Sequence, residues 1–324
     1  MIHWPKLWGK HLAIPVVLAG IAGGLALPAA RAADADSPPP ASAEVAPAPA
    51  PAPTPASTGN IFGDYFADWD RRVAAARASQ PEWSSPVVTT TAMLEQRFRF
   101  DTAFQHAGNG ADTIDLDGGK GVDLIVGDAT EVQIAAAPYY VRTTPGKADI
   151  TGFNDWPFFR IKERLFSSPE DAGDYVVSVW LQTQAATGIY TLTNHAFTLL
   201  PTLGFGKGFG PFIIQGTLGG VIPTTDQNTL GSQVAGNLAF QYHLWQVFWP
   251  QLEVNWTHYI GGPRDGRDQV FLTPGVVFGK FSVTDRLKFT FGAGYQLAVE
   301  PKYQPSPLLP TYNHSVVVTT RLTF

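Results

Sequence analysis

The sequence predicts an all-β fold: an antiparallel transmembrane β-barrel of about 12 strands, within a range of 10 to 14, preceded by a short amphipathic helix. Three observations support this prediction. Only 15% of the 324 residues are charged while the mean hydropathy is near zero, which is unusual for a chain with a fully water-facing surface. Many segments alternate apolar and polar residues with a period of two, as strands with one apolar face do. The chain also ends inside such a segment.

The composition excludes several classes of function. The chain contains no cysteine, so disulfides, cysteine-based zinc sites and thiol catalysis are excluded. Its formal net charge of -5 argues against a nucleic-acid partner, because neutralising phosphates requires a basic surface. We therefore expect no nucleic-acid partner, no metal and no cofactor.

The first 32 residues are typical of a cleaved secretory signal. Lys6 and Lys10 precede an apolar stretch, Leu12 to Leu27, and a small-residue cleavage site follows at Ala30-Arg31-Ala32. The stretch contains proline and glycine and is shorter than the roughly 20 residues that a membrane-spanning helix requires. We predict export, followed by a Pro/Ala-rich extended linker over residues 33–60.

Residues 61–82 are predicted to form an amphipathic helical segment. The helix is expected over Ile61–Ala78, where apolar residues recur at spacings of three and four. Three placements are open: packing on the main domain, plugging a lumen, or lying in the membrane interface.

Residues 83–324 are predicted to form the barrel. They contain no run of 18 apolar residues, which excludes helical membrane spans. Eleven segments qualify as strands, and bacterial single-chain barrels use an even number, so twelve is the expected count. The candidates are 94–104, 131–136, 157–165, 175–182, 196–203, 212–221, 237–243, 252–257, 269–279, 287–296 and 312–324.

The polar faces of these strands are predicted to line the lumen. On the first three strands they form a basic wall that contains some acids. Such a wall either favours anionic solutes, including aromatic carboxylates, or pairs with opposite charges across a narrow lumen and fills it without conduction. The lumen-lining candidates are Glu95, Arg97, Arg99, Asp101, Glu131, Gln133, Arg160, Lys162, Arg164, Glu253 and Lys288.

The closing strand carries a pattern typical of bacterial outer-membrane proteins. Val316, Val318, Leu322 and Phe324 share one face, and we predict that they form the signal read by the barrel-insertion machinery. Aromatic residues on the apolar faces predict contact with outer-membrane lipid. The expected location is therefore the bacterial outer membrane.

Short stretches between residues 93 and 324 resemble the Gram-negative outer-membrane β-barrel family of transporters of the MetA pathway of phenol degradation. This resemblance implies a channel for hydrophobic compounds but contains no substrate motif. The matching stretches are Glu131-Val132-Gln133-Ile134, Phe240-Gln241-Tyr242-His243, 249–255, 262–266, 269–275 and the closing strand.

Two motifs suggest other chemistry. Residues 118–126 fit a calcium-binding nonapeptide and 108–115 nearly repeat it, but the copies lie 11 residues apart rather than nine. We therefore expect a Gly-rich extracellular loop with solvated Asp112, Asp115 and Asp117. His314 and Ser315 are adjacent, so in a strand they point to opposite faces and cannot act together as base and nucleophile.

The leading functional hypothesis is a non-enzymatic outer-membrane channel or facilitator for small molecules, including aromatic or hydrophobic ones. The first alternative is a structural or adhesive barrel with a closed lumen. The second is an outer-membrane hydrolase, for which the sequence offers no catalytic residues.

Overall fold

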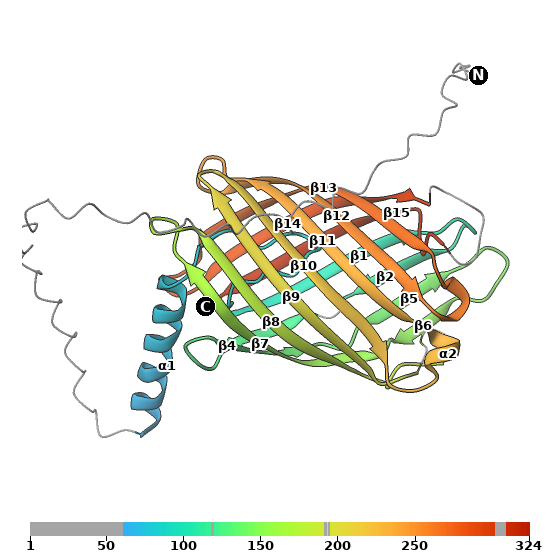
Figure 1. Cartoon of the computed structure of the whole chain (residues 1–324), viewed down its shortest axis with the longest axis horizontal. Coiled ribbons are helices and arrows are strands. Elements are labelled where there is room, and N and C mark those ends of the chain that lie inside the picture. The colour runs from blue at the N-terminus through green and yellow to red at the C-terminus, as the bar shows by residue number, and fades with distance from the viewer. Residues whose placement is uncertain (1–60, 118–119, 191–192, 194, 302–308) are drawn as a thin grey trace, which may run out of the picture. The chain divides into compact units, whose positions relative to one another are not determined.

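The computed structural model describes residues 61–117, 120–190, 193, 195–301 and 309–324. The predicted signal (1–32) and linker (33–60) lie outside these ranges. Within them, one long helix, α1 (Ile61–Ala78), precedes an antiparallel sheet (Figure 1). No helix of the described ranges is long and apolar enough to cross a membrane. The strands are β1 (Arg97–His106), β2 (Asp112–Leu116), β3 (Gly121–Ile125), β4 (Thr130–Ala135), β5 (Tyr139–Thr143), β6 (Ile150–Phe153), β7 (Trp156–Ser168), β8 (Tyr175–Ala185), β9 (Thr198–Phe209), β10 (Phe212–Pro223), β11 (Ser232–Tyr242), β12 (Phe248–Ile260), β13 (Asp268–Ser282), β14 (Lys288–Glu300) and β15 (His314–Thr323).

The fifteen segments form twelve barrel strands. β2 pairs with the second half of β1, and β3 pairs with its first two residues, so β2 and β3 are one interrupted strand. β4 pairs with β3 and β5 pairs with β2, so β4 and β5 form the next interrupted strand. In the same way, β7 pairs with β4 and β6 pairs with β5, and β6 and β7 form the strand after it. With β1 and the eight strands from β8 to β15, the wall has twelve strands. The predicted number is confirmed.

The barrel closes between its first and last strands. β1 and β15 pair along ten residues, from Arg97 opposite Thr323 to His106 opposite His314. Since β15 also pairs with β14, no strand edge remains at the closure. Full closure satisfies the backbone donors and acceptors that a lipid environment cannot satisfy.

The strand missing from the sequence prediction is the one built from β2 and β3. Residues 108–126 were expected to form a Gly-rich loop, and this expectation is wrong, because Asp112 and Asp115 lie on β2 and Asp123 lies on β3. Gly121 allows β3 to approach β4 closely, since a Cβ at this position would lie 2.3 Å from the carbonyl oxygen of Ile134. Here glycine marks close strand packing rather than a loop.

The wall alternates apolar outward and polar inward. On β1, Phe98 and Phe100 are 37% and 36% exposed, whereas Arg97 and Arg99 are buried. On β15, Val316 and Val318 are exposed, whereas Ser315 is buried. A period of two places successive side chains on opposite faces, so the inner face holds the polar groups.

Helix α1 has the predicted bounds and packs on one end of the barrel. Val73 and Ala76 are buried against Leu94 and Ile125. Arg77 in its last turn donates hydrogen bonds to the carbonyl oxygens of Gln96 and Phe324. Of the three placements expected for the helix, packing on the main domain is the one observed (Figure 1).

The two ends of the barrel differ in the lengths of their connections. At the end next to α1 and Phe324 the turns are short, for example 210–211 between β9 and β10 and 283–287 between β13 and β14. At the opposite end the connections include 186–197 and 301–313. We call these the short-turn end and the long-loop end.

Candidate functional site

The lumen contains a segment of the chain that belongs to neither helix nor wall. Residues 80–96, called here the inner segment, join α1 to β1 and are almost entirely buried. The wall therefore begins at Arg97, not at residue 83. Trp83, Val87 and Met93 form the apolar core of the lumen with residues of the wall, which are Val176, Ile213, Trp249, Val277 and Val317.

Acidic side chains of the wall hold N–H groups of the inner segment. Glu253 on β12 accepts hydrogen bonds from the backbone of Val88 at 2.8 Å and of Thr89 at 2.6 Å. Glu131 on β4 accepts one from the backbone of Glu95 at 2.7 Å. A carboxylate can accept several such bonds, and hydrogen bonds to charged groups are the stronger ones.

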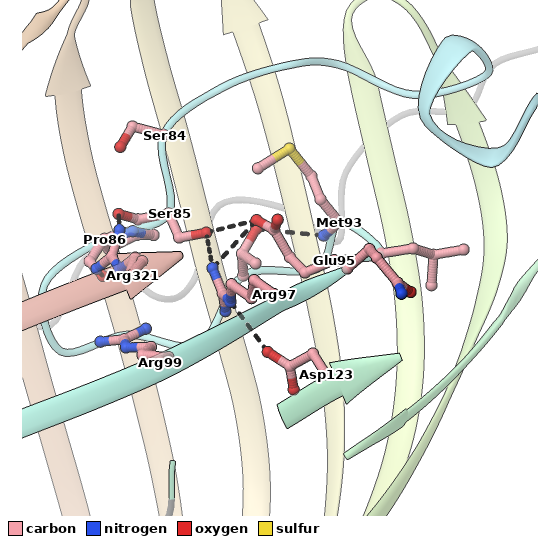
Figure 2. Close-up of polar contacts among 12 residues, drawn as sticks. Ser84, Ser85, Pro86, Met93, Glu95, Arg97, Arg99, Asp123 and Arg321 are labelled. Atoms are coloured by element: carbon pink, nitrogen blue, oxygen red, sulfur yellow. Dashed lines mark hydrogen bonds and ion pairs between the residues drawn. The ribbon is translucent and has the colours of Figure 1, made fainter. Parts of the chain in front are cut away.

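Basic side chains of the wall hold the carbonyl groups. Arg321 on β15 donates to Ser85 at 2.5 Å and to Pro86 at 2.6 Å, and Figure 2 shows these residues together in the lumen. Arg99 donates to the carbonyl oxygen of Val87 at 2.5 Å. Lys162 donates in the same way to Met93 at 2.9 Å.

Neutral side chains complete the attachment. Ser178 donates to the carbonyl oxygen of Ala92, and Gln215 donates to that of Ser84. Gln215 also begins a row of hydrogen-bonded side chains that crosses β10, β11 and β12. The row runs from Gln215 through Gln241 and Gln251 to Glu253. The side chains that hold the inner segment are therefore themselves held in place.

The charges of the wall also pair with one another. Arg97 lies 2.9 Å from Asp123 and 3.2 Å from Glu95 (Figure 2). Arg160 lies 2.9 Å from Asp123 and 3.1 Å from Glu131. These groups are buried or nearly so, and a buried charge requires such partners.

This buried layer contains four more of the predicted residues, which are Arg99, Asp101, Gln133 and Lys162. Lys162 lies 2.9 Å from Glu131, so the same lysine joins the wall charges to the inner segment. Arg99 lies 2.8 Å from Asp101. Gln133 donates to Asp123 at 2.7 Å. Pairing of opposite charges in a filled lumen, one of the two interpretations of the sequence, describes this layer.

Three predicted residues have different surroundings. Glu95 precedes β1 and belongs to the inner segment, not to the first strand as expected. Arg164 lies at the short-turn end and binds the carbonyl oxygen of Ala76, which anchors α1. Lys288 is exposed at the start of β14. The insertion role of Val316, Val318, Leu322 and Phe324 stays a prediction.

Sequence reasoning missed Asp123, Arg321 and the inner segment. Asp123 lies in the Gly-rich stretch that was interpreted as a loop. Arg321 lies in the closing strand, whose outward face alone was considered, although alternation from Ser315 and Thr319 places Arg321 on the inner face.

One anchor of the inner segment lies in a turn. The indole Nε1 of Trp83 donates to Asp174 at 2.9 Å, and Asp174 precedes β8 in the 169–174 turn. Burial raises the pKa of the Asp174 carboxyl, and the negative charge of Glu170 raises it further.

The described ranges contain no site for metal binding or for hydrolysis by His314 and Ser315. Within these ranges, no group of three or more His, Cys, Asp or Glu side chains is placed to hold a metal. Ser315 is buried on the inner face, while the ring of His314 stacks on His106 with centroids 5.1 Å apart. The His314–Ser315 pair is split as expected.

No family model and no curated protein matches the chain. Solved structures with a similar fold include the NanC porin, at 8% identity and a TM-score of 0.44, covering 70% of this chain and 98% of that chain. An outer membrane channel from Pseudomonas putida F1 is 10% identical with a TM-score of 0.46, covering 75% and 100%. The DcaP channel of Acinetobacter baumannii is 9% identical with a TM-score of 0.29, covering 70% and 72%. Membership of the phenol-degradation transporter family stays a prediction.

Proposed function

We propose that the protein is an outer-membrane channel for small anions whose lumen is closed at rest by the inner segment. The observation that supports this proposal is the difference between two kinds of attachment. Backbone ladders join the wall strands, whereas side chains of the wall hold the inner segment. The inner segment can therefore leave the lumen without breaking any strand pairing.

Departure of the inner segment changes the charges that a solute meets. Arg99, Arg321 and Lys162 then lose their carbonyl partners and face the open lumen. Glu131 and Glu253 lose their N–H partners at the same time, so the freed groups are three cations and two anions. Because charged side chains set pore selectivity, we propose a preference for anions, including aromatic carboxylates. Among the described residues, the buried basic groups are Arg97, Arg99, Arg160, Lys162 and Arg321, and the buried acids are Asp101, Asp117, Asp123, Glu131, Asp155, Asp174 and Glu253. The resemblance noted in the sequence supports aromatic or hydrophobic molecules as the cargo.

The proposed membrane location and orientation follow from the apolar outer face of the barrel and from the different lengths of the connections at its two ends. The apolar outer face fits outer-membrane lipid, and the short-turn end fits the periplasmic side, since outer-membrane barrels have short periplasmic turns. A cleaved signal and recognition of the closing strand by the insertion machinery are parts of the same proposal.

A second candidate is a structural or adhesive barrel with a permanently closed lumen. The extent of the attachment favours it, because acidic, basic and neutral side chains from β1, β4, β7, β8, β10, β12 and β15 all bind the inner segment. In this case the inner segment stiffens the barrel and never leaves.

Planar-bilayer conductance distinguishes the two candidates. The mature chain is compared with a variant that lacks residues 61–96, which retains every wall strand because the wall begins at Arg97. Heat-modifiability on gels first shows that both are folded. A channel gives rare, anion-selective steps from the mature chain and larger, sustained currents from the variant. Silence from both folded proteins contradicts the channel and supports the structural barrel.

A further inference from the structure

A cavity of about 610 Å³ opens at the short-turn end, next to the charged network of the lumen, with which it shares Glu95. It lies between α1, both ends of the inner segment, and the ends of β13, β14 and β15. Sites for small molecules typically have volumes of about 300–1,000 Å³, so this cavity has room for one.

One side of the cavity is apolar and largely aromatic. Helix α1 contributes Phe66 and Trp69, whose rings stack with centroids 6.4 Å apart. The inner segment contributes Trp83, Met93 and Leu94. Such walls bind a flat or chain-like apolar group by burying its surface.

The polar side of the cavity offers unmatched donors. The Nζ of Lys280 donates to the carbonyl oxygen of Glu82 at 3.3 Å but has no carboxylate within ion-pair distance in the described ranges. Lys288 has neither a hydrogen bond nor an ion pair within the same ranges. The indole Nε1 of Trp69 is buried and has no acceptor.

Most other charges of the cavity are already matched or solvated. Arg286 pairs with Asp70 at 3.0 Å, and Glu95 is bound by Arg97 at 3.2 Å. Arg77 donates to backbone carbonyl groups. The acids Glu82 and Asp285 are exposed and stay in water. The donors that remain for a ligand are Lys280, Lys288 and the Trp69 indole.

We propose that this cavity binds an amphipathic organic anion. Its apolar part lies against Phe66, Trp69 and Trp83, and its carboxylate or phosphate oxygens accept hydrogen bonds from Lys280, Lys288 and the Trp69 indole. The site lies beside the proposed conduction path, and it is complete only while the inner segment occupies the lumen. It also touches residues 80–83 and 93–96, the two ends of that segment.

The chemistry fits two sources, a free organic anion and the phosphate of an anionic lipid. The test uses the full mature chain in nanodiscs of zwitterionic phosphatidylcholine, so that detergent does not compete. Isothermal titration with benzoate, and with benzyl alcohol as the matched neutral compound, probes the free anion. Native mass spectrometry after adding phosphatidylglycerol probes the lipid.

The double variant Lys280→Met and Lys288→Met tests the donors, and Lys147→Met in the 144–149 connection at the long-loop end is its control. We expect one benzoate site, binding about tenfold weaker in the double variant and unchanged in the control, with benzyl alcohol about tenfold weaker than benzoate. Trp69→Phe, which keeps the ring and removes the N–H, lowers affinity a few-fold.

The site is assigned to lipid if the unchanged chain retains phosphatidylglycerol, the double variant does not, and neither binds benzoate. No binding of either probe to a folded barrel overturns the proposal, as does binding that the double variant leaves unchanged. Neither readout requires a current, so a silent barrel that binds refutes only the channel. A conducting barrel that binds neither probe refutes only this site.

Discussion

The guanidinium of Arg321 donates a hydrogen bond to the carbonyl oxygen of Ser85, 236 residues earlier in the chain, at 2.5 Å. This bond connects the last wall strand to the inner segment. Because β15 is also the strand that closes the barrel against β1, the inner segment gains this contact only in the closed barrel. Closure of the wall and occupation of the lumen are therefore coupled.

Replacing Arg321 by methionine should release the inner segment. The change leaves the buried carbonyl groups of Ser85 and Pro86 without their donor, at a cost of about 2–3 kcal/mol. We expect the open time in planar bilayers to rise by tenfold or more. Arg267→Met is the control, since Arg267 is exposed in the 261–267 connection at the long-loop end. An unchanged open time in a folded Arg321→Met barrel contradicts a role for this contact in closure.

Replacing Glu253 by glutamine should loosen the middle of the inner segment. An amide presents one acceptor oxygen where the carboxylate presents two, so one of the two N–H groups of Val88 and Thr89 loses its partner. Hydrogen exchange at these two amides should become at least about tenfold faster. Glu300→Gln, at the exposed end of β14, should leave both rates unchanged.

Replacing Asp123 by asparagine should destabilise the wall. Asp123 lies 2.9 Å from both Arg97 and Arg160, and its neutralisation leaves two buried guanidinium groups with less compensation. The expected loss is about 3 kcal/mol, seen as a lower midpoint in a heat-modifiability series. The exposed Asp149 is the matched control. Equal midpoints for Asp123→Asn and Asp149→Asn would show that the network does not stabilise the barrel.

A disulfide between residues 92 and 178 should lock the lumen. The hydroxyl of Ser178 donates to the carbonyl oxygen of Ala92 at 2.5 Å, and the natural chain contains no cysteine that could form other disulfides. With Ala92→Cys and Ser178→Cys together, oxidation should abolish the current and a reductant should restore it. Each single substitution serves as a control. A current that persists under oxidation, with the disulfide verified by mass spectrometry, shows that ions pass without departure of the inner segment.

Replacing Phe324 by alanine should reduce assembly. Phe324 is 40% exposed and, in the predicted insertion signal, it supplies the terminal aromatic group. We expect less heat-modifiable barrel in isolated outer membranes at equal expression. Phe209→Ala removes an exposed aromatic group from another strand end and should have little effect. Equal assembly of the two variants counts against the predicted signal.

Alternation made most of the wall predictable. A period of two separated Arg97 and Arg99 from Phe98 and Phe100 in the sequence, and burial separates them in the same way in the structure. The helix over Ile61–Ala78 was predictable for the same kind of reason, with spacings of three and four. Both patterns are local, so one sequence suffices to find them.

The rest depended on contacts between distant residues. Gly121 was interpreted as part of a loop. The reason for glycine at this position is the carbonyl group of Ile134, which leaves no room for a side chain and lies on another strand. Most charges of the wall were predicted, but the backbone partners of Glu253 and Lys162 were not, because a charged face has the same sequence pattern whether it meets a solute or a backbone. Only the three-dimensional structure shows which of these two partners a charged side chain has.

Several contacts between the wall and the inner segment do not depend on the side chains of the inner segment. Wall side chains bind the N–H groups of Val88 and Thr89 and the carbonyl groups of Pro86 and Val87. Main-chain groups are common to every residue type, apart from the N–H that proline lacks. At these positions the wall recognises the course of the main chain and not the side chains, so other residues of suitable size can take the same course. Substitutions should therefore be tolerated better at Thr89 and Thr90 than at Val87, which packs in the apolar core, or at Ser85 and Thr91, whose hydroxyl groups bond to Arg97 and Gln215.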